Sequence, residues 1–433
     1  MRSGSDEYTT AFVRFSRHSV GLLHSPISLG PAASVGLIVS HPNSDYLNHI
    51  SGAELASRGF RVLCVNGRYV NTRREHLIWE HVPLDIQPAV AYLRKLTGVR
   101  VVILVGHSGG GQLMPFYQNL AENGARAAQQ PGRFAQGGAA LSGLPPADGL
   151  VLLDPHHGYG ANTLTSLDPA VRDEANPAAV DPALDIFDPA NGYDPLRPNY
   201  SQDFLARYFR AQAERMTRLN GRAWERAQAI AAGKGVYHDD EPFVVARGQA
   251  RVWQLDTRLV SETRGTYPIL TADGQTVQDR ARSVRVSGVT PGSSGAAGLT
   301  AAQNASYHGG TVVYSVKSWL SGNAISVDPE RYQVTRDNIV GIDWDSSNTS
   351  TPANIANIRA PLLIMGMTGH YWMVPSEIFF NAAASQDKQL VFVEGASHNL
   401  VPCRACETSP GQYGDTVNTI FDYVAGWLQA RFL

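Results

Sequence analysis

The sequence predicts an α/β fold with a mostly parallel sheet flanked by helices and a large mixed α/β insertion. Short apolar runs alternate with amphipathic, helix-like stretches over residues 1–154, and the same alternation resumes in residues 361–433. Residues 155–360, between these two blocks, have a different and mixed character. Because alternating strands and helices build a parallel sheet covered on both faces, we expect one core from the outer blocks, interrupted by 155–360.

The core elements follow one another in a regular order. Two strand-like segments at its start, 11–17 and 19–26, are expected to pair antiparallel. Continuous apolar runs predict the buried strands that follow: 34–41, 61–66, 101–105, 149–154, 360–366 and 388–395. Amphipathic stretches predict the core helices: 45–59, 82–96, 111–124 and 415–432.

The insertion has its own pattern of elements. A long helix-like stretch, residues 201–233, is followed by the strand-like segments 243–255 and 310–320. Residues 287–306 are rich in Gly, Ser and Ala, which predicts an exposed or mobile loop. A segment of this length and patterning is not a linker, so we expect a folded subdomain.

A serine stands among glycines where one predicted strand meets the next helix. Residues 106–110 read GHSGG, a GxSxG motif directly after the apolar run 101–105. Glycines beside Ser108 remove the Cβ atoms that would collide where the helix leaves the strand, so the hydroxyl projects above the sheet. The first N–H groups of the helix lie beside that hydroxyl, where negative charge develops in acyl transfer. A phosphate-binding turn is the alternative, but GHSGGG matches neither GxGxxG nor GxxxxGKS. The motif therefore predicts Ser108 as a nucleophile.

A serine nucleophile needs a base, and His398 is the strongest candidate among the 13 histidines. It lies in GASHN, after the predicted strand 388–395, at the carboxyl edge of the sheet where Ser108 must also stand. His107, beside the serine, is expected to point elsewhere. Three further histidines lie on other loops, and we expect them to have structural roles: His156, His157 and His370.

Three segments of the chain, GHSGGG, SHPNSD at residues 40–45 and GASHN, resemble the α/β-hydrolase superfamily, in which the nucleophile comes first and the histidine last. The resemblance covers the two core blocks. It implies an α/β-hydrolase fold with residues 155–360 as a cap over the carboxyl edge of the sheet. It also implies an oxyanion hole made by the N–H groups of Gly109 and Asn43. Pro42 is a departure, because the family usually has glycine after the residue equivalent to His41.

The catalytic acid is where the sequence departs most from the family. Many relatives carry Asp soon after the strand equivalent to 360–366, but this chain has no carboxylate there before Glu377. Asp154 ends the predicted strand 149–154, and other members of the fold place the acid at that strand's end, so we favour Asp154. Glu377 is the rival, although it also suits a helix N-terminus. Glu394 is too embedded in its strand to reach the histidine.

The resemblance implies a two-step acyl transfer in which His398 takes the proton of Ser108, with no metal or organic cofactor. The predicted substrate is a carboxylic ester of a small, apolar molecule. Amide, lactone and carbon–carbon bond hydrolysis use the same groups and remain alternatives, as does a catalytically inert hydrolase fold that binds a ligand. Four aromatic residues of the insertion either line an apolar pocket or form the insertion's own core: Trp253, Tyr314, Trp319 and Trp344.

The overall composition limits the class of partner. A formal net charge of -2 provides no strong field to attract nucleic acid or anionic lipid, so we expect a small-molecule substrate. The chain has no run of 18 apolar residues and no signal-like segment at its start, so we expect a cytoplasmic protein that does not span a membrane. The sequence makes no prediction of oligomeric state.

The three cysteines provide no disulfide framework. Cys403 and Cys406 form a CxxC pair, but a zinc site would need two more ligands at matching spacing. A thioredoxin-like pair would stand at a helix start near an N-terminal strand, whereas this pair follows HNLVP. We therefore expect a reduced or locally bridged loop here, and Cys64 as a residue of a buried strand.

Overall fold

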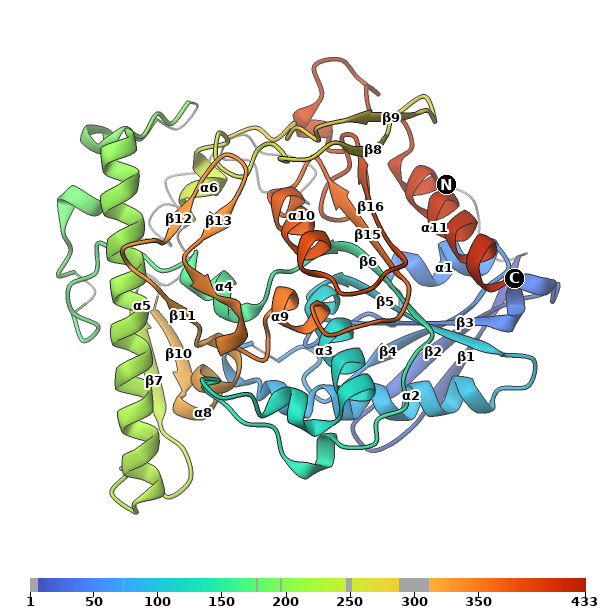
Figure 1. The fold of residues 1–433 in the computed structure, drawn as a ribbon, viewed down its shortest axis with the longest axis horizontal. Helices are drawn as coiled ribbons and strands as arrows, with labels where there is room; N and C mark the ends of the chain where they lie inside the picture. The colour runs from blue at the N-terminus through green and yellow to red at the C-terminus, as the bar shows by residue number, and fades with distance from the viewer. Residues whose placement is uncertain (1–6, 73, 177, 195–196, 247–250, 288–310) are drawn as a thin grey trace.

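The protein was analysed as a computed structural model that describes residues 7–72, 74–176, 178–194, 197–246, 251–287 and 311–433. Its centre is a ten-stranded sheet with the order β1-β2-β4-β3-β5-β6-β15-β16-β8-β9 (Figure 1). The strands of the N-terminal block are β1 Tyr8–Arg14, β2 Val20–Pro26, β3 Val35–Ser40, β4 Arg61–Asn66, β5 Val101–Ser108 and β6 Gly149–Pro155. The others are β8 Tyr267–Leu270, β9 Thr276–Asp279, β15 Leu362–Met367 and β16 Lys388–Val393.

The strand directions match the sequence-based expectation. The first two strands pair antiparallel with Tyr8 opposite Pro26, and β2 is also antiparallel to β4. The pairs from β4 through β3, β5, β6, β15 and β16 to β8 are all parallel. Parallel strands place their carboxyl ends at one edge, so the loops after β3, β5, β6, β15 and β16 meet there.

Helices cover the sheet on both faces, in two separate apolar layers. One layer contains α1 Ile50–Ser57 and α11 Thr416–Phe432, and the other contains α2 Pro83–Lys95, α3 Gly110–Asn123 and α10 Met373–Ala382. Along β5, Val102 and Leu104 belong to one layer while Ile103 and Val105 belong to the other, because side chains of a strand alternate between faces. A mostly parallel sheet of this order, covered on both faces, confirms the α/β-hydrolase fold.

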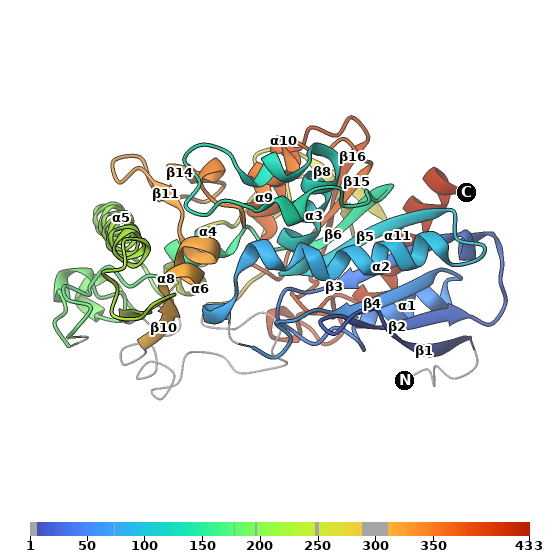
Figure 2. The ribbon, with the colours of Figure 1, turned by 90° about the horizontal axis from the view of Figure 1, so that it is seen from below.

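The insertion is dominated by one long helix, α5 Gln202–Ala231. Ser201 caps it by accepting a hydrogen bond from the Phe204 N–H. Figures 1 and 2 both place α5 at the far end of the molecule from β1. Its other elements are α4 Tyr159–Leu164, β7 Pro242–Ala246, α6 Val252–Leu255, β10 Thr311–Ser315, α8 Val316–Ser318, β11 Ser326–Val327, β12 Gln333–Val334, β13 Ile339–Val340, β14 Ile342–Asp343 and α9 Thr351–Ile355, with 3-10 or π turns at Pro182–Leu184, Pro189–Asn191, Trp319–Asn323 and Trp344–Ser346.

Two expected strand segments of the insertion are shorter than predicted. Strand β7 ends at Ala246 and α6 begins at Val252, so the segment 243–255 is only partly a strand. Strand β10 pairs antiparallel with β7 and ends at Ser315. The Ser315 side chain accepts from the Ser318 N–H, and this cap turns the chain into a helix where the apolar pattern alone favoured continued strand.

The boundary of the insertion differs from the expected range 155–360. Strands β8 and β9 lie within that range but extend the core sheet, with Ile269 and Leu270 beside Phe392 and Val393. Helix α9 also packs against the core helices α3 and α10. Pairing with β8 protects the edge of β16, a non-local effect that the short apolar run YPIL does not reveal. In the glycine-rich stretch 287–306, everything after Ser287 lies outside the described residues.

The aromatic residues of the insertion belong mainly to its own core. The Trp319 ring lies 5.1 Å from both Phe243 and Tyr314, and Trp319 and Tyr314 are buried. Trp253 is also buried, and Trp344 packs against the same apolar cluster while staying partly exposed. Across the described residues, no helix is both long and apolar enough to cross a membrane.

The turn from β5 into α3 should tolerate no side chain at Gly110. A Cβ added there would lie 2.3 Å from the Ser40 carbonyl oxygen, a backbone atom of the neighbouring strand. We expect Gly110→Ala to destabilise the fold by about 1–3 kcal/mol, as overpacking does elsewhere. The matched control is Gly426→Ala in α11, where nothing lies within 4 Å of an added Cβ and alanine should stabilise by up to about 1 kcal/mol. Urea unfolding of both variants measures this, and equal stabilities would contradict the crowding at Gly110.

Candidate active site

Ser108 occupies a strained turn between a strand and a helix. It is the last residue of β5, α3 begins at Gly110, and the backbone of Ser108 has a φ of 56°. A positive φ is costly for a residue with a Cβ, so the surroundings must hold it in place. They do so by close packing, since a Cβ on Gly106 would lie 2.5 Å from the Gly110 carbonyl oxygen. This is the turn that the GxSxG motif predicts.

The structure brings together three residues that are far apart in the sequence. The Nε2 of His398 lies 2.9 Å from the Ser108 Oγ, and its Nδ1 lies 2.6 Å from the Asp154 Oδ2. When Nδ1–H donates to the carboxylate, Nε2 is left with a lone pair that accepts the serine hydroxyl. Ser108 and His398 are partly exposed while Asp154 is fully buried. The geometry is that of a nucleophile, its base and a carboxylate that orients the base.

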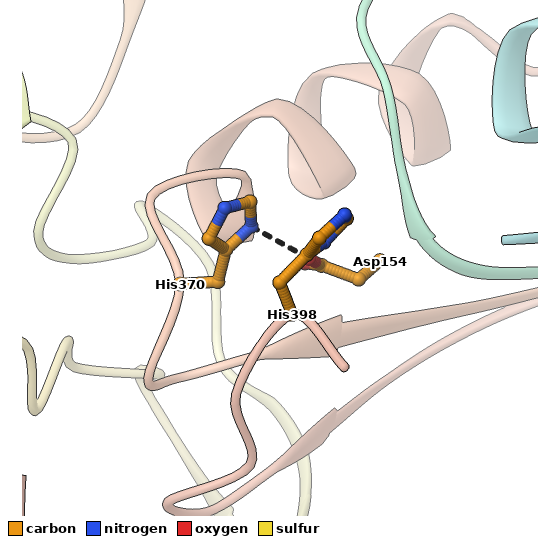
Figure 3. A group of neighbouring side chains, drawn as sticks. All are labelled: Asp154, His370 and His398. Atoms are coloured by element: carbon orange, nitrogen blue, oxygen red, sulfur yellow. Dashed lines mark hydrogen bonds and ion pairs between the residues drawn. The ribbon is translucent and has the colours of Figure 1, made fainter. Parts of the chain in front are cut away.

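A second histidine, His370, shares the carboxylate of Asp154. Its Nδ1 lies 2.6 Å from the same Oδ2, although out of line for a good hydrogen bond. Figure 3 shows His370 and His398 directed at Asp154 from two different loops. Burial by itself raises the pKa of Asp154, but the two histidines outweigh it, so the pKa lies well below its usual range. Asp154 is therefore an ionised carboxylate at neutral pH.

His370 stands in the loop after β15, the place where many relatives of the fold carry the acid. Burial lowers its pKa to about 4, despite the opposing effect of Asp154, so its ring is neutral at neutral pH. We expected only a structural role for it, and no local sequence signal revealed its contact with Asp154. In this chain the carboxylate that contacts the base comes from the end of β6.

Asp154, His370 and His398 are also the one group, within the part of the chain that the structure describes, close enough to hold a metal ion. Their possible ligand atoms lie within 4.8 Å of one another. The 2.6 Å distance from His398 Nδ1 to Asp154 Oδ2, however, is that of a charge-assisted hydrogen bond, and the His370 nitrogen stands equally close to the same oxygen. Ligands around a zinc ion stand about 2.0–2.2 Å from the metal and so farther from each other.

Glu377, the rival acid, is engaged elsewhere. Its carboxylate accepts the N–H of Arg264 at 2.9 Å, the N–H of Gly265 at 2.7 Å and the Tyr267 hydroxyl at 2.9 Å. These bonds tie α10 to the segment leading into β8. The structure therefore brings Asp154, and not Glu377, to His398.

The backbone N–H of Asn43, the expected second oxyanion donor, is engaged in another hydrogen bond. Its backbone N–H donates to His41 Nδ1 at 3.2 Å, and its side-chain amide donates to the Thr72 carbonyl at 3.1 Å. Its side-chain oxygen accepts from the Tyr159 hydroxyl at 3.0 Å. The resemblance implied that the Asn43 N–H donates to the oxyanion, but this N–H donates to the His41 ring instead. Gly109 lies at the N-cap of α3, as expected.

A chain of neutral histidines supports the loop that carries His398. The Ser51 N–H donates to His49 Nδ1 at 3.3 Å, so the proton of His49 is on Nε2, which lies 3.1 Å from His107 Nδ1. The Nε2–H of His107 then donates to the His398 carbonyl at 2.7 Å. Burial lowers the pKa of His49 to about 4 and that of His107 well below its ordinary value. His107 thus points away from the serine, as expected, but holds the backbone of the base.

Tyr46 adds a hydroxyl to this group. It lies 2.8 Å from His107 Nδ1, so His49 and Tyr46 offer two donors to one lone pair. The Tyr46 ring stacks on His49 with centroids 4.4 Å apart. Neither Tyr46 nor His49 carries a motif that would have assigned it to the site.

An aromatic wall borders the pair of Ser108 and His398. The Trp372 ring meets His398 edge to face at 4.8 Å and lies 4.6 Å from His156. The His156 N–H donates to the Ser108 carbonyl at 3.0 Å, which ties the end of β6 to the turn. His157 stacks on His156 at 5.1 Å and is fully buried.

The CxxC pair forms a local bridge. Cys403 and Cys406 are joined by a disulfide, while Cys64 is free and buried in β4. The Cys403 N–H donates to the Gly395 carbonyl at 2.8 Å, which closes the loop that carries His398. Of the expected states, the structure has the bridged one.

No protein-family model matches the chain, and no curated protein sequence matches it. Among solved structures, it is similar to a hypothetical protein of Pseudomonas aeruginosa at 14% identity, over 100% of this chain and 98% of that one, with a TM-score of 0.42. It is also similar to a bacterial brefeldin A esterase, described as a homologue of human hormone-sensitive lipase, at 12% identity, with 100% and 80% covered and a TM-score of 0.41. A third is the proline iminopeptidase of Mycobacterium smegmatis, at 13% identity, with 98% of each chain covered and a TM-score of 0.39.

The buried neutral histidines should make the fold sensitive to acid. The pKa values of His49 and His370 are lowered to about 4, and those of His41 and His157 to about 3. An unfolded histidine takes up its proton near pH 6.5, so below that pH the unfolded state holds more protons than the folded state. The stabilisation is complete above about pH 6.5 and lost as pH falls toward 4, by up to about 1.4 kcal/mol per pH unit for each histidine.

Thermal melts across this pH range measure the effect, and we expect the midpoint to fall steadily below pH 6.5. His157→Phe is the matched variant, because it removes one of these titrating rings and keeps an aromatic side chain. Its midpoint should fall less steeply with pH than that of the wild type. A midpoint that is constant from pH 7 to 4.5 would contradict burial of these histidines in the neutral form.

Proposed function

We propose that the protein is a serine hydrolase that cleaves a carboxylic ester of a small, apolar molecule through an acyl-enzyme on Ser108. The observation that carries the proposal is the continuous line of contacts from Ser108 Oγ through His398 to Asp154, at 2.9 Å and 2.6 Å. The serine stands at a positive-φ turn at the start of a helix, where a hydroxyl is exposed to an incoming carbonyl group.

The residues divide the reaction between them. His398 Nε2 takes the hydroxyl proton as Ser108 Oγ attacks the carbonyl carbon, and the carbonyl oxygen becomes an oxyanion beside the Gly109 N–H. The imidazolium then gives its proton to the departing alcohol, which leaves the acyl group on the serine. A water molecule, deprotonated by His398, attacks the acyl carbon, and as the acid leaves His398 returns the proton to Ser108 Oγ. The ionised Asp154 holds the His398 tautomer and stabilises the imidazolium without accepting its proton.

Apolar surroundings support an apolar substrate. Trp372 offers a ring beside His398, and the buried rings of Tyr371 and Trp253, with centroids 5.9 Å apart, pack behind it. Aromatic side chains of this kind favour the acyl or alcohol portion of an apolar ester. An inert binding protein of the same fold would need no base aligned on its serine, so the contact of His398 with Ser108 favours catalysis.

Ser108 should react as an activated nucleophile. We expect a fluorophosphonate probe to modify the wild type, and Ser108→Ala to abolish labelling and to lower kcat for p-nitrophenyl acetate by about four orders of magnitude or more. Ser57→Ala, an exposed serine at the end of α1, is the control and should match the wild type. Esterase turnover retained in Ser108→Ala would overturn the assignment, and a wild type inert to both reagents would favour a binding protein.

Substitutions of Asp154 and Glu377 should differ in their effects on kcat and on stability. Asp154→Asn should lower kcat by about 10⁴-fold, because the amide favours the wrong imidazole tautomer. Glu377→Gln should leave kcat near the wild-type value and cost about 1–2 kcal/mol of stability, since it weakens a carboxylate that accepts three hydrogen bonds. Kinetics and thermal melts of both variants measure this. A loss of kcat in Glu377→Gln together with full activity in Asp154→Asn would reverse the two roles.

A further inference from the structure

His41 binds the backbone N–H groups of the loop after β3. Its Nδ1 accepts two backbone hydrogen bonds, from the Asn43 N–H at 3.2 Å and from the Ser44 N–H at 2.9 Å. A residue at position 42 contributes no N–H, because it is proline. The loop after β3 therefore folds its available N–H groups onto a side chain and leaves no backbone donor of residues 42–44 free for an oxyanion.

These two bonds determine where the proton of His41 lies. Burial, followed by the nearby charges of His398 and His49, lowers the pKa of His41 to about 3, so the ring is neutral at neutral pH. A neutral imidazole has one N–H and one lone pair, and Nδ1 is using its lone pair to accept. The proton must then be on Nε2.

The Nε2 of His41 lies against the residue that follows the nucleophile. A Cβ added to Gly109 would stand 2.5 Å from this nitrogen. Glycine at position 109 thus allows the imidazole to approach the turn. No acceptor in the described part of the chain takes the Nε2–H, although His41 keeps 9% of its surface accessible.

We propose that the His41 Nε2–H is the second donor of the oxyanion hole, beside the Gly109 N–H, in place of the Asn43 N–H. The inference rests on the proposed hydrolase function. A side-chain donor held by two backbone bonds is preorganised, which is what stabilises a developing negative charge most effectively.

The neutrality of His41 suits the reaction. When His398 takes the serine proton it becomes a cation, and this charge is one of the causes that hold the pKa of His41 low. His41 therefore stays a neutral donor during the step in which the oxyanion forms. A permanently charged donor at this place would oppose the protonation of His398.

Two substitutions at position 41 separate donor from acceptor. In His41→Asn the shorter amide oxygen can still accept from Asn43 and Ser44, but the donor at the Nε2 position is lost. In His41→Gln the longer side chain returns an amide N–H to that region. We expect His41→Asn to lower kcat for p-nitrophenyl acetate by about 100- to 1000-fold with little change in KM, and His41→Gln to recover part of it.

Binding of a trifluoromethyl ketone provides a readout that a purely structural role would not move, because its adduct with Ser108 carries an oxyanion. Its affinity for His41→Asn should fall in parallel with kcat, whereas thermal melts should match the wild type. In the wild-type adduct, a proton NMR spectrum should show a His41 Nε2–H shifted downfield and protected from exchange. This measurement decides the matter if His41→Asn does not fold.

The outcomes distinguish this inference from the function on which it rests. A wild type that is labelled at Ser108 and hydrolyses esters, combined with His41→Asn at full rate, overturns the role of His41 and leaves the hydrolase intact. The Tyr46 hydroxyl also neighbours Ser108, so a loss of kcat in Tyr46→Phe with His41→Asn unaffected moves the donor to Tyr46 and equally overturns the role of His41. A wild type that neither reacts nor hydrolyses overturns both.

Discussion

The fully buried carboxylate of Asp154 is the interaction on which the geometry of the site depends. A negative charge without a partner in this position would cost several kcal/mol, so the surrounding loops must supply donors. His398, after β16, donates a hydrogen bond to it, and the His370 ring, after β15, lies in close contact with the same oxygen from a second loop. The loop after β6, the loop after β15 and the loop after β16 are therefore held together by one carboxylate, and the same contact aims His398 at Ser108.

Neutral imidazole rings surround this single charge. In each of them, the nitrogen that accepts a hydrogen bond leaves the ring proton on the other nitrogen. Ser51 fixes His49, His49 and Tyr46 face His107, and His107 holds the His398 backbone. Neutral rings pack closely, as the 4.9 Å separation of the His49 and His107 rings shows, because they do not repel one another as cations would. The crowding in turn disfavours protonation of each ring, so packing and neutrality support each other.

The insertion is joined to the core by hydrogen bonds of residues that take no part in the proposed reaction. Glu377 accepts from Arg264, Gly265 and Tyr267, and β8 extends the sheet beside β16. These contacts anchor the insertion on the side of the sheet that also carries His398. A carboxylate that by sequence rivalled Asp154 thus serves to orient the insertion that borders the site.

The core strands, the turn around Ser108 and the candidate base could be predicted from the sequence alone. Alternating apolar runs and the steric needs of GHSGG depend on neighbouring residues, so a local pattern reveals them. The sequence favoured Asp154 over Glu377 as the acid, the resemblance pointed to Asn43, and no pattern gave His370, Tyr46 or His49 its contacts in the site. These contacts arise in the folded chain, because which ring meets which N–H depends on loops that are distant in sequence and converge at one edge of the sheet. The tautomer of His41 and the engagement of Glu377 are properties of that packing, and no local pattern encodes them.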